Sequence, residues 1–247
     1  MDQQRPSAES LAQAVALFER ALALDPVNVD ALSGLAMVNF NVAAWGGLTD
    51  DRAARFAAAE ATAAKALSLE PDSAFAHLIM GLVLGFTKRA EQGTAECERA
   101  LALDRNLAAA HGIIGLYKVL LGHAEEAETE VQDALRLSPR DTWAFAWLFF
   151  VGMAKSLLDR PELAVVWLRR SLECNRNFPP SHFNLAAALA RLGRMDEARA
   201  AGKAGLALDP QFTIARFRAI AESDNPVYLA QREQLVDGMS KAGVPEG

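Results

Sequence analysis

The sequence predicts an all-α protein built from repeated pairs of short helices. The first observation is a recurring helix ending: ALALDP ends at Pro26, ALSLEP at Pro71, ALALDR at Arg105, ALRLSP at Pro139, SLECNR at Arg176 and GLALDP at Pro210. Successive endings lie 34 to 45 residues apart. Between these endings, apolar residues recur at every third or fourth position, which is the period of an amphipathic helix. Alanine and leucine, both strong helix formers, dominate the composition.

Residues 108–141 show the repeating unit in its simplest form. A first helix, called the A helix, carries apolar residues at Ile113, Tyr117 and Leu120, and Gly122 interrupts it. A second helix, the B helix, follows and ends before Pro139. Neither helix can cover its own apolar face, so such a unit is stable only when stacked on copies of itself.

A 34-residue helix–turn–helix period resembles the tetratricopeptide repeat. The small residues of that family's pattern fall on Gly115, Ala127 and Ala134, and in other units on Ala36, Ala59, Ala66, Gly81, Gly93, Ala100, Ala186, Ala198 and Gly205. The resemblance implies a right-handed α-solenoid in which these residues let paired helices approach within about 8–10 Å. One unit departs from the pattern, because bulky Phe149 falls in its small position.

The resemblance divides the chain into three parts. Residues 1–27 form an unpaired helix with the register of a B helix, residues 28–212 form five helix pairs, and residues 213–247 form capping helices. The pairs lie at about 28–72, 73–106, 107–140, 141–177 and 178–211. The unpaired first helix leaves apolar surface bare, and the preceding residues, a preceding domain or a second copy of the chain could cover it.

Turn and cap residues place the other boundaries. The connection from Ala43 to Asp51 lies in a region eleven residues longer than the standard period. Gly46 and Gly47 predict a loop there, Thr49 or Asp50 would cap the next helix, and Trp45 either anchors a partner or packs the loop onto the helix ends.

Prolines predict the starts of three later helices. Pro161 and Pro179 are each placed to begin a helix, and Asn225-Pro226 is placed to begin the last helix. That last helix carries Tyr228, Leu229, Leu235, Val236 and Met239 on one side and Gln231, Arg232, Glu233, Asp237 and Lys241 on the other. We expect it to shield the last repeat from water.

The A helices of tetratricopeptide arrays line a concave groove, and the resemblance implies which residues face it here. We expect a partner-binding groove formed by Met37, Phe40, Asn41, Phe75, Leu78, Leu82, Phe86, Leu116, Leu120, Trp143, Phe150, Met153, Phe183 and Arg191. This apolar set suits a helical or extended peptide segment, or part of the chain itself. It lacks the basic residues with which such arrays bind acidic chaperone termini. The alternative is that some of these side chains are buried between A helices.

No motif predicts catalysis, a cofactor or a metal site. His77, His111 and His182 share one repeat position, but stacked repeats hold them too far apart for the roughly 2.0–2.1 Å bonds of zinc. Glu125, Glu126, Glu128 and Glu130 suit the positive end of a helix. We therefore expect no enzyme activity.

Charge and cysteine content limit the partners and the compartment. The net charge is −6 without a basic cluster, which argues against nucleic acid. No apolar run reaches the length of a membrane span. Cys97 and Cys174 are far apart and suit a reducing cytoplasm. We expect a cytoplasmic protein that binds a protein or peptide.

A narrower resemblance favours a second function. FERALALDP, the connection with WGG, TWAFAWLFF and the ending SDNPVYLAQREQLVDGMSKAGVPEG look like the carboxy-terminal tetratricopeptide region of bacterial multidomain regulators. In that group the array follows a class III adenylate cyclase or a winged-helix domain. The resemblance implies a regulatory or sensing module that acts in cis or through a homodimer formed by its first helix.

Overall fold

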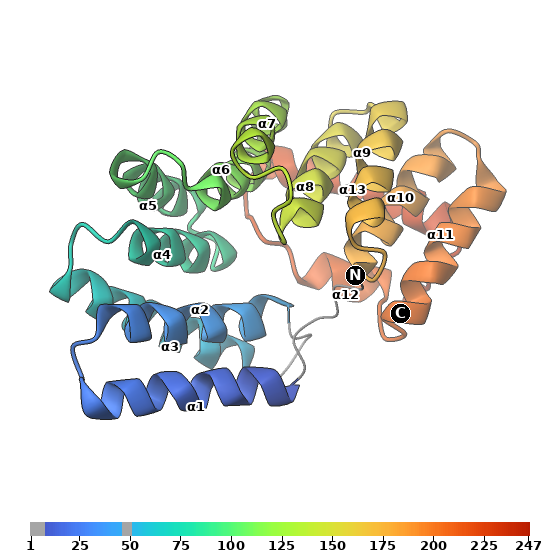
Figure 1. Cartoon of the computed structure of the whole chain (residues 1–247). Coiled ribbons are helices and arrows are strands. Elements are labelled where there is room, and N and C mark those ends of the chain that lie inside the picture. The colour runs from blue at the N-terminus through green and yellow to red at the C-terminus, as the bar shows by residue number, and fades with distance from the viewer. Residues whose placement is uncertain (1–7, 46–50) are drawn as a thin grey trace. The chain divides into compact units, whose positions relative to one another are not determined.

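The computed structural model describes residues 8–45 and 51–247, and these residues form helices joined by short turns (Figure 1). The helices are α1 (Ala8–Leu24), α2 (Val29–Trp45), α3 (Arg52–Leu69), α4 (Ala74–Phe86), α5 (Ala90–Leu103), α6 (Ala108–Leu120), the 3-10 helix η1 (Ala124–Glu126), α7 (Ala127–Leu137), α8 (Ala144–Leu157), α9 (Pro161–Cys174), α10 (Pro179–Arg191), α11 (Met195–Leu208), α12 (Ile214–Ala219) and α13 (Pro226–Lys241). No strand occurs in either described range, so the all-α prediction is confirmed.

The helices pack in consecutive pairs within two compact units. Unit 1 extends to Ala110 and unit 2 begins at His111, in the first turn of α6. In unit 1, α2 packs on α3 and α4 on α5; in unit 2, α8 packs on α9 and α10 on α11. In the described residues, no helix has both the length and the apolar composition needed to cross a bilayer.

Small residues bring the paired helices of unit 1 close together. A Cβ atom added to Gly81 of α4 would lie 2.6 Å from the Cys97 sulfur and 3.0 Å from the Gly93 carbonyl oxygen of α5. The first helix also packs on a glycine, but through a side chain, because a Cβ atom on Gly34 of α2 would lie 2.3 Å from the Phe18 ring of α1. Close backbone approach therefore determines which faces of these helices are buried.

Glycines also lie where the paired helices of unit 2 cross. A Cβ atom on Gly115 would lie 3.1 Å from the Ala127 carbonyl oxygen, and one on Gly152 would lie 2.6 Å from Leu168 Cγ. The assignment of Phe149 to the small position of α8 is therefore wrong, because Gly152, three residues later, occupies it. This repeat is three residues longer than the 34-residue period, since its ending at Arg176 lies 37 residues after Pro139. The crossing glycines Gly115 and Gly152 are also 37 residues apart, so the three additional residues precede the α8–α9 crossing. The Phe149 ring instead packs 5.4 Å from that of Phe178.

One turn geometry recurs between the paired helices. Gly122 and Gly193 have positive φ angles of 88° and 73°, and Lys88 and Asp159 take the same place in their turns with φ of 65° and 56°. The residue after each closes a backbone hydrogen bond five residues back, as from Arg89 N to Leu84 O at 2.9 Å. The turn tolerates Lys and Asp, although glycine adopts this backbone conformation without a steric penalty.

Helix starts follow the prolines and caps of the sequence. Pro161, Pro179 and Pro226 lie in the first turns of α9, α10 and α13. The Asn225 side chain accepts hydrogen bonds from Val227 N at 2.9 Å and Tyr228 N at 3.2 Å. The expected roles of Gly46, Gly47, Thr49, Asp50 and the Trp45 side chain lie outside the described residues.

A test of the close crossings is Gly81→Val, which adds a side chain where no space exists. We expect it to lower the free energy of unfolding by about 1–3 kcal/mol, the usual cost of overpacking. Ala95→Val, at an exposed position of α5, is the control and should change stability by less than about 0.5 kcal/mol. Thermal or urea unfolding measures both; equal stability of the two variants would contradict the packing argument.

Candidate functional site

The groove residues predicted on α2 and α4 have different degrees of exposure. Phe40, Leu78 and Leu82 are buried, and Met37, Asn41 and Phe86 are half-buried. Phe75, in the first turn of α4, is 44% exposed. In unit 1 Phe75 is therefore the large predicted groove side chain that offers most surface to a partner.

An aromatic cluster joins three helices of unit 1. The ring centroids of Phe40 and Phe86 are 5.1 Å apart at 90°, and the Phe56 ring lies 6.1 Å from that of Phe40. An open cavity of about 520 Å³ borders this cluster, lined by Arg52, Ala53, Phe56, Ala57, Glu60, Phe86 and Thr87. The groove assignment missed this cavity because most of its lining comes from the B helix α3. The sequence signal for this cavity was the spacing of Arg52 and Phe56, which are four residues apart and so lie on one face of a helix.

Two charged residues, Arg52 and Glu60, are among those that line the cavity. The Arg52 guanidinium lies 5.1 Å from the Phe56 ring centroid, and its Nε donates to the Ala43 carbonyl oxygen at 2.9 Å. Arg89 binds both carboxylate oxygens of Glu60, at 2.8 and 2.6 Å. This hydrogen bonding, with the attraction of the Arg89 charge, lowers the pKa of Glu60 although burial opposes it.

The groove residues predicted in unit 2 are mostly buried. Leu116, Leu120, Phe150, Met153 and Phe183 have little exposed surface, and Arg191 is half-buried. Trp143, just before α8, is 37% exposed and its ring stacks 5.7 Å from that of Phe145.

Part of this burial comes from the chain's own last helix. Helix α13 packs across the A helices α10 and α8, and Figure 1 shows its ribbon beside them. A Cβ atom on Gly238 of α13 would lie 2.6 Å from the Ala187 carbonyl oxygen of α10, so the two backbones touch. Leu235, Val236 and Met239 are buried around this crossing. We call the face of α8 and α10 under α13 the α13 seat.

Hydrogen bonds attach both ends of α13 to the rest of unit 2. Before the helix, the Ser223 hydroxyl donates to Leu120 O at 2.6 Å and the Asn225 amide to Leu121 O at 2.9 Å. After it, the carbonyl oxygens of Pro245 and Glu246 accept from Ile214 N and Ala215 N at 2.9 and 2.8 Å. The expectation that the final helix shields the last repeat is thus too narrow, because it lies on two A helices.

Arg232 shows that α13 does not divide into faces as its sequence suggests. The sequence pattern places Arg232 on the polar side, but the residue is buried. Its guanidinium lies 3.7 Å from the Phe217 ring centroid and donates to the Phe217 carbonyl oxygen. Leu229, assigned to the apolar side, is exposed. Arg232 thereby joins α13 to the carboxyl end of α12, where the carbonyl groups need donors.

The three repeated histidines each form hydrogen bonds with nearby protein groups, and two of them bond within their own repeats. His77 Nδ1 lies 2.6 Å from Glu96 Oε2, and His111 Nδ1 lies 2.8 Å from Glu130 Oε2. His182 Nε2 lies 2.8 Å from the Arg176 carbonyl oxygen. Two of these histidines therefore join an A helix to its own B helix, and the 19-residue His-to-Glu spacing in both repeats was the sequence signal.

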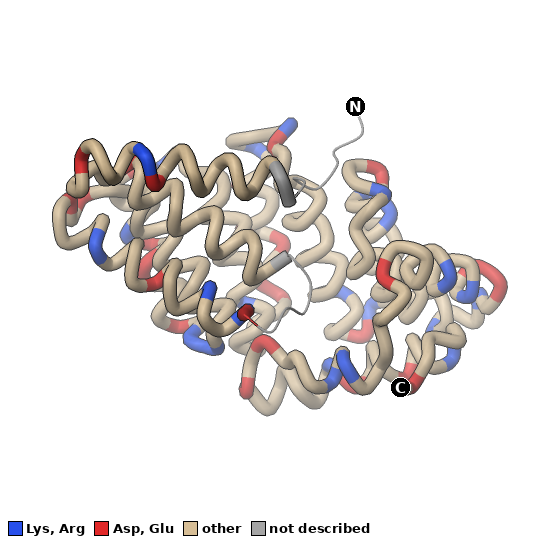
Figure 2. The backbone as a smooth tube through the Cα atoms, turned by 90° about the horizontal axis from the view of Figure 1, so that it is seen from below, with Lys and Arg blue, Asp and Glu red and all other residues tan. Residues whose placement is uncertain are grey.

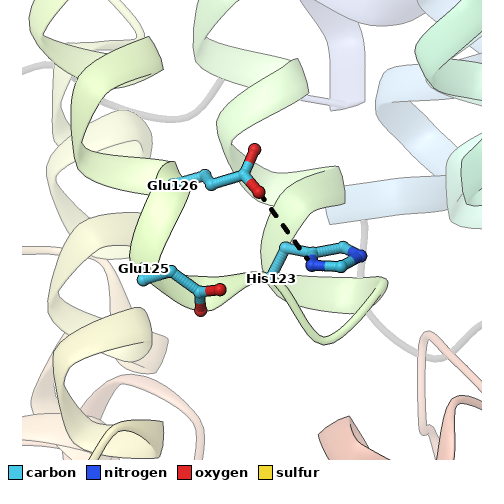
Figure 3. Close-up of side chains that lie close together, drawn as sticks. All are labelled: His123, Glu125 and Glu126. Atoms are coloured by element: carbon cyan, nitrogen blue, oxygen red, sulfur yellow. Dashed lines mark ion pairs between the residues drawn. The ribbon is translucent and has the colours of Figure 1, made fainter.

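The carboxylates around η1 also have cationic neighbours. Glu128 lies 2.5 Å from the buried Lys155 ammonium, and Glu126 lies 2.7 Å from that of Lys118. Figure 3 shows His123, Glu125 and Glu126, whose potential ligand atoms lie within 4.8 Å of one another. All three are exposed, and hydrogen bonding with Lys118 lowers the pKa of Glu126, so a cation would compete with the lysine.

The two cysteines differ in burial, and the charged residues are spread along the chain. Burial raises the pKa of the Cys97 thiol to about 12, so it stays protonated and is a poor nucleophile at neutral pH. Cys174 is exposed, and both cysteines are free. Figure 2 shows basic and acidic residues scattered along the chain rather than gathered in one long basic stretch.

The Glu60–Arg89 pair gives a pH-dependent prediction. The folded state lowers the pKa of Glu60, so the ionised carboxylate stabilises the fold. This stabilisation is fully present above the unfolded-state pKa of about 4.3 and is lost as the pH falls through the folded-state pKa. We expect Glu60→Gln to lower the free energy of unfolding at pH 7 by less than about 1 kcal/mol, since the pair is about one-third exposed.

The difference between Glu60→Gln and the wild type should shrink as the pH is lowered from 7 to 3. Urea unfolding across this range measures it, with Glu98→Gln, exposed on α5, as the matched control. A difference that stays constant with pH would contradict the assigned role of Arg89.

A family model described as the tetratricopeptide repeat matches residues 167–200. These residues run from the second half of α9 through α10 into α11. The comparison with curated proteins gives no match.

Solved structures resemble the chain over most of its length. PilF of Pseudomonas aeruginosa is 20% identical, with a TM-score of 0.63 over 87% of this chain and 88% of PilF. Human IFIT1, solved as a dimer with m7Gppp-AAAA, is 17% identical, with a TM-score of 0.71 over 94% of this chain and 56% of IFIT1. YrrB, titled a TPR protein with an unusual peptide-binding site, is 24% identical, with a TM-score of 0.49 over 71% of this chain and 91% of YrrB. At these identities, the similarity to PilF and IFIT1 shows the fold alone, which is an array of paired helices. The tetratricopeptide repeat model matches residues 167–200 of this array.

Proposed function

We propose that this chain is a non-enzymatic scaffold that binds a helical or extended segment of a partner protein on its A helices. The observation that carries the proposal is the α13 seat, where A helices α8 and α10 hold helix α13 and its buried Leu235, Val236 and Met239. The seat has the features that helix binding needs, namely apolar side chains and a small residue, Ala187, that allows close backbone approach. Because the repeats share one pattern, the A helices of unit 1 are expected to have the same capacity.

The A helices of unit 1 supply the surface for an outside partner in this proposal. Phe75 is the exposed anchor, Met37 and Asn41 are half-buried, and the buried Leu78 and Leu82 support the surface from below. An exposed phenylalanine on a rigid helix loses little conformational entropy on binding and buries a large apolar area. The proposed partner is therefore a protein segment with an apolar stripe, and nucleic acid is not part of the proposal.

The location in the proposal is the cytoplasm. Cys97 and Cys174 are free thiols, as a reducing compartment would keep them.

Substitution of Phe75 tests the unit 1 site. We expect Phe75→Ala to weaken partner capture at least ~10-fold, as loss of an interface anchor does, without changing helicity. The control is Leu103→Ala, which removes a similarly exposed apolar side chain from the end of B helix α5. Quantitative affinity capture with circular dichroism of each variant gives the comparison. A partner retained equally by both variants would rule out the Phe75 surface as its site.

A second candidate function, the regulatory module acting in cis or by dimerisation, rests on the narrower sequence resemblance and on the surface of α1. Leu17 and Leu24 of α1 are 63% and 90% exposed, and Val27 follows them. These leucines are two helical turns apart and so lie on one face, as a helix–helix contact requires.

Acidic substitutions on α1 test this second candidate. If two copies of the chain pair through this face of α1, the double variant Leu17→Glu, Leu24→Glu should be a monomer. The two substitutions in each of two chains would place four charges in one apolar interface. Sedimentation equilibrium measures the change, with Ala16→Glu and Ala23→Glu, also exposed on α1, as the control. A wild-type chain that is monomeric at all concentrations would exclude the homodimer.

A further inference from the structure

The contact between α13 and its seat contains polar atoms without partners. Within the described residues, Asn184 Oδ1 and Gln231 Oε1 are buried and make no hydrogen bond. Asn184 is 3% exposed and lies on α10 one turn before Ala187, the residue that Gly238 touches. Gln231 belongs to α13, on the same helix face as Leu235 and Gly238 by its spacing of four and seven residues. Each such atom has given up water without gaining a protein partner, which weakens the docking of α13.

The backbone contact at the centre of the seat is, by contrast, highly selective. At Gly238 an added Cβ atom would lie 2.6 Å from the carbonyl oxygen and 2.8 Å from the Cα of Ala187. Backbone atoms cannot move aside as a side-chain tip can, so the seat accepts only the smallest residues at this position. Leu235, Val236 and Met239 add the apolar contacts on either side.

The polar attachments of α13 to α6 and α10 lie before its first turn and at Gln234. Ser223 and Asn225 bind two carbonyl oxygens at the end of α6, and Arg191 of α10 donates to Gln234 at 2.9 Å. The preceding connection, residues 220–225, is six residues long, and α12 before it has only six residues. Undocking would move α12 together with α13, because Arg232 and the carbonyl oxygens of Pro245 and Glu246 bind α12.

We propose that α13 is an internal ligand of a helix-binding site, released from its seat to admit an amphipathic helix of a partner protein. The chemistry of the seat defines that helix. It carries Gly at the position facing Ala187, apolar residues three and two positions before it and one after, and a hydrogen-bond donor able to reach Asn184 Oδ1. Such a helix makes the apolar contacts of α13 and also satisfies the amide oxygen that α13 leaves without a partner. The inference rests on the proposed function and adds its regulation, since the chain's own helix competes with the partner.

The test uses the full chain and a fluorescent peptide with the sequence of residues 223–244. In the Gly238→Val chain, α13 cannot dock but the seat itself is unchanged. We expect this variant to bind the peptide at least ~10-fold more tightly than the wild-type chain, whose seat is occupied. A peptide with the same Gly238→Val change should not bind. Adding Ala187→Leu to the Gly238→Val chain should abolish binding, because the larger side chain fills the seat.

The matched control is Asp237→Val, which places the same side chain on the adjacent, exposed position of α13. This chain should bind the peptide as weakly as the wild type does. A Gly238→Val chain that is folded by circular dichroism and binds the peptide no better than the Asp237→Val chain overturns the proposal.

Hydrogen exchange of the wild-type chain gives a readout that does not depend on a variant folding. Release of α13 requires its amides to exchange through a local opening, faster than the amides of α10. Equal protection of both helices would mean that they open only together, and it would overturn the proposal. Neither measurement involves Phe75, so failure here leaves the Phe75 capture test to decide the proposed function separately.

Discussion

The close approach of paired helices at small residues is the constraint on which the rest of this structure depends. Gly81, Gly115 and Gly152 each lie against a B helix at distances that leave no room for a side chain. Gly205 shows the converse arrangement, since it belongs to a B helix and lies under the Phe183 ring of an A helix. Once these crossings are made, the rotation of each helix is fixed, and so is the set of side chains that it buries.

This fixed rotation explains the polar pairs between helices. His77 meets Glu96 and His111 meets Glu130 because both residues of each pair project from the facing sides of a closely packed hairpin. The run of glutamates from Glu125 to Glu130 is used in a similar way, since Glu126 and Glu128 meet lysines of neighbouring A helices. These two glutamates therefore connect neighbouring helices through ion pairs.

The α13 seat extends the same packing rule to a helix outside the repeats. Gly238 meets Ala187 as closely as the glycines of the hairpins meet their partners. The difference lies in nearby polar atoms, because Asn184 of α10 and Gln231 of α13 each leave a buried atom without a hydrogen bond. A contact that is sterically specific and incompletely bonded has the properties expected of an exchangeable ligand.

The sequence by itself determined the helices, their pairing and most of the small residues at the crossings. These features depend on local periodicity, on caps such as Asn225 and on a repeated pattern, all of which are present in the order of residues. The tertiary structure alone decided the register of α8, where three additional residues moved the crossing from Phe149 to Gly152. It also decided which groove residues are exposed, such as Phe75, and which are buried, such as Phe150. Contacts between segments about fifty residues apart, such as Gly238 on Ala187, depend on how helices stack, and no local pattern encodes that stacking.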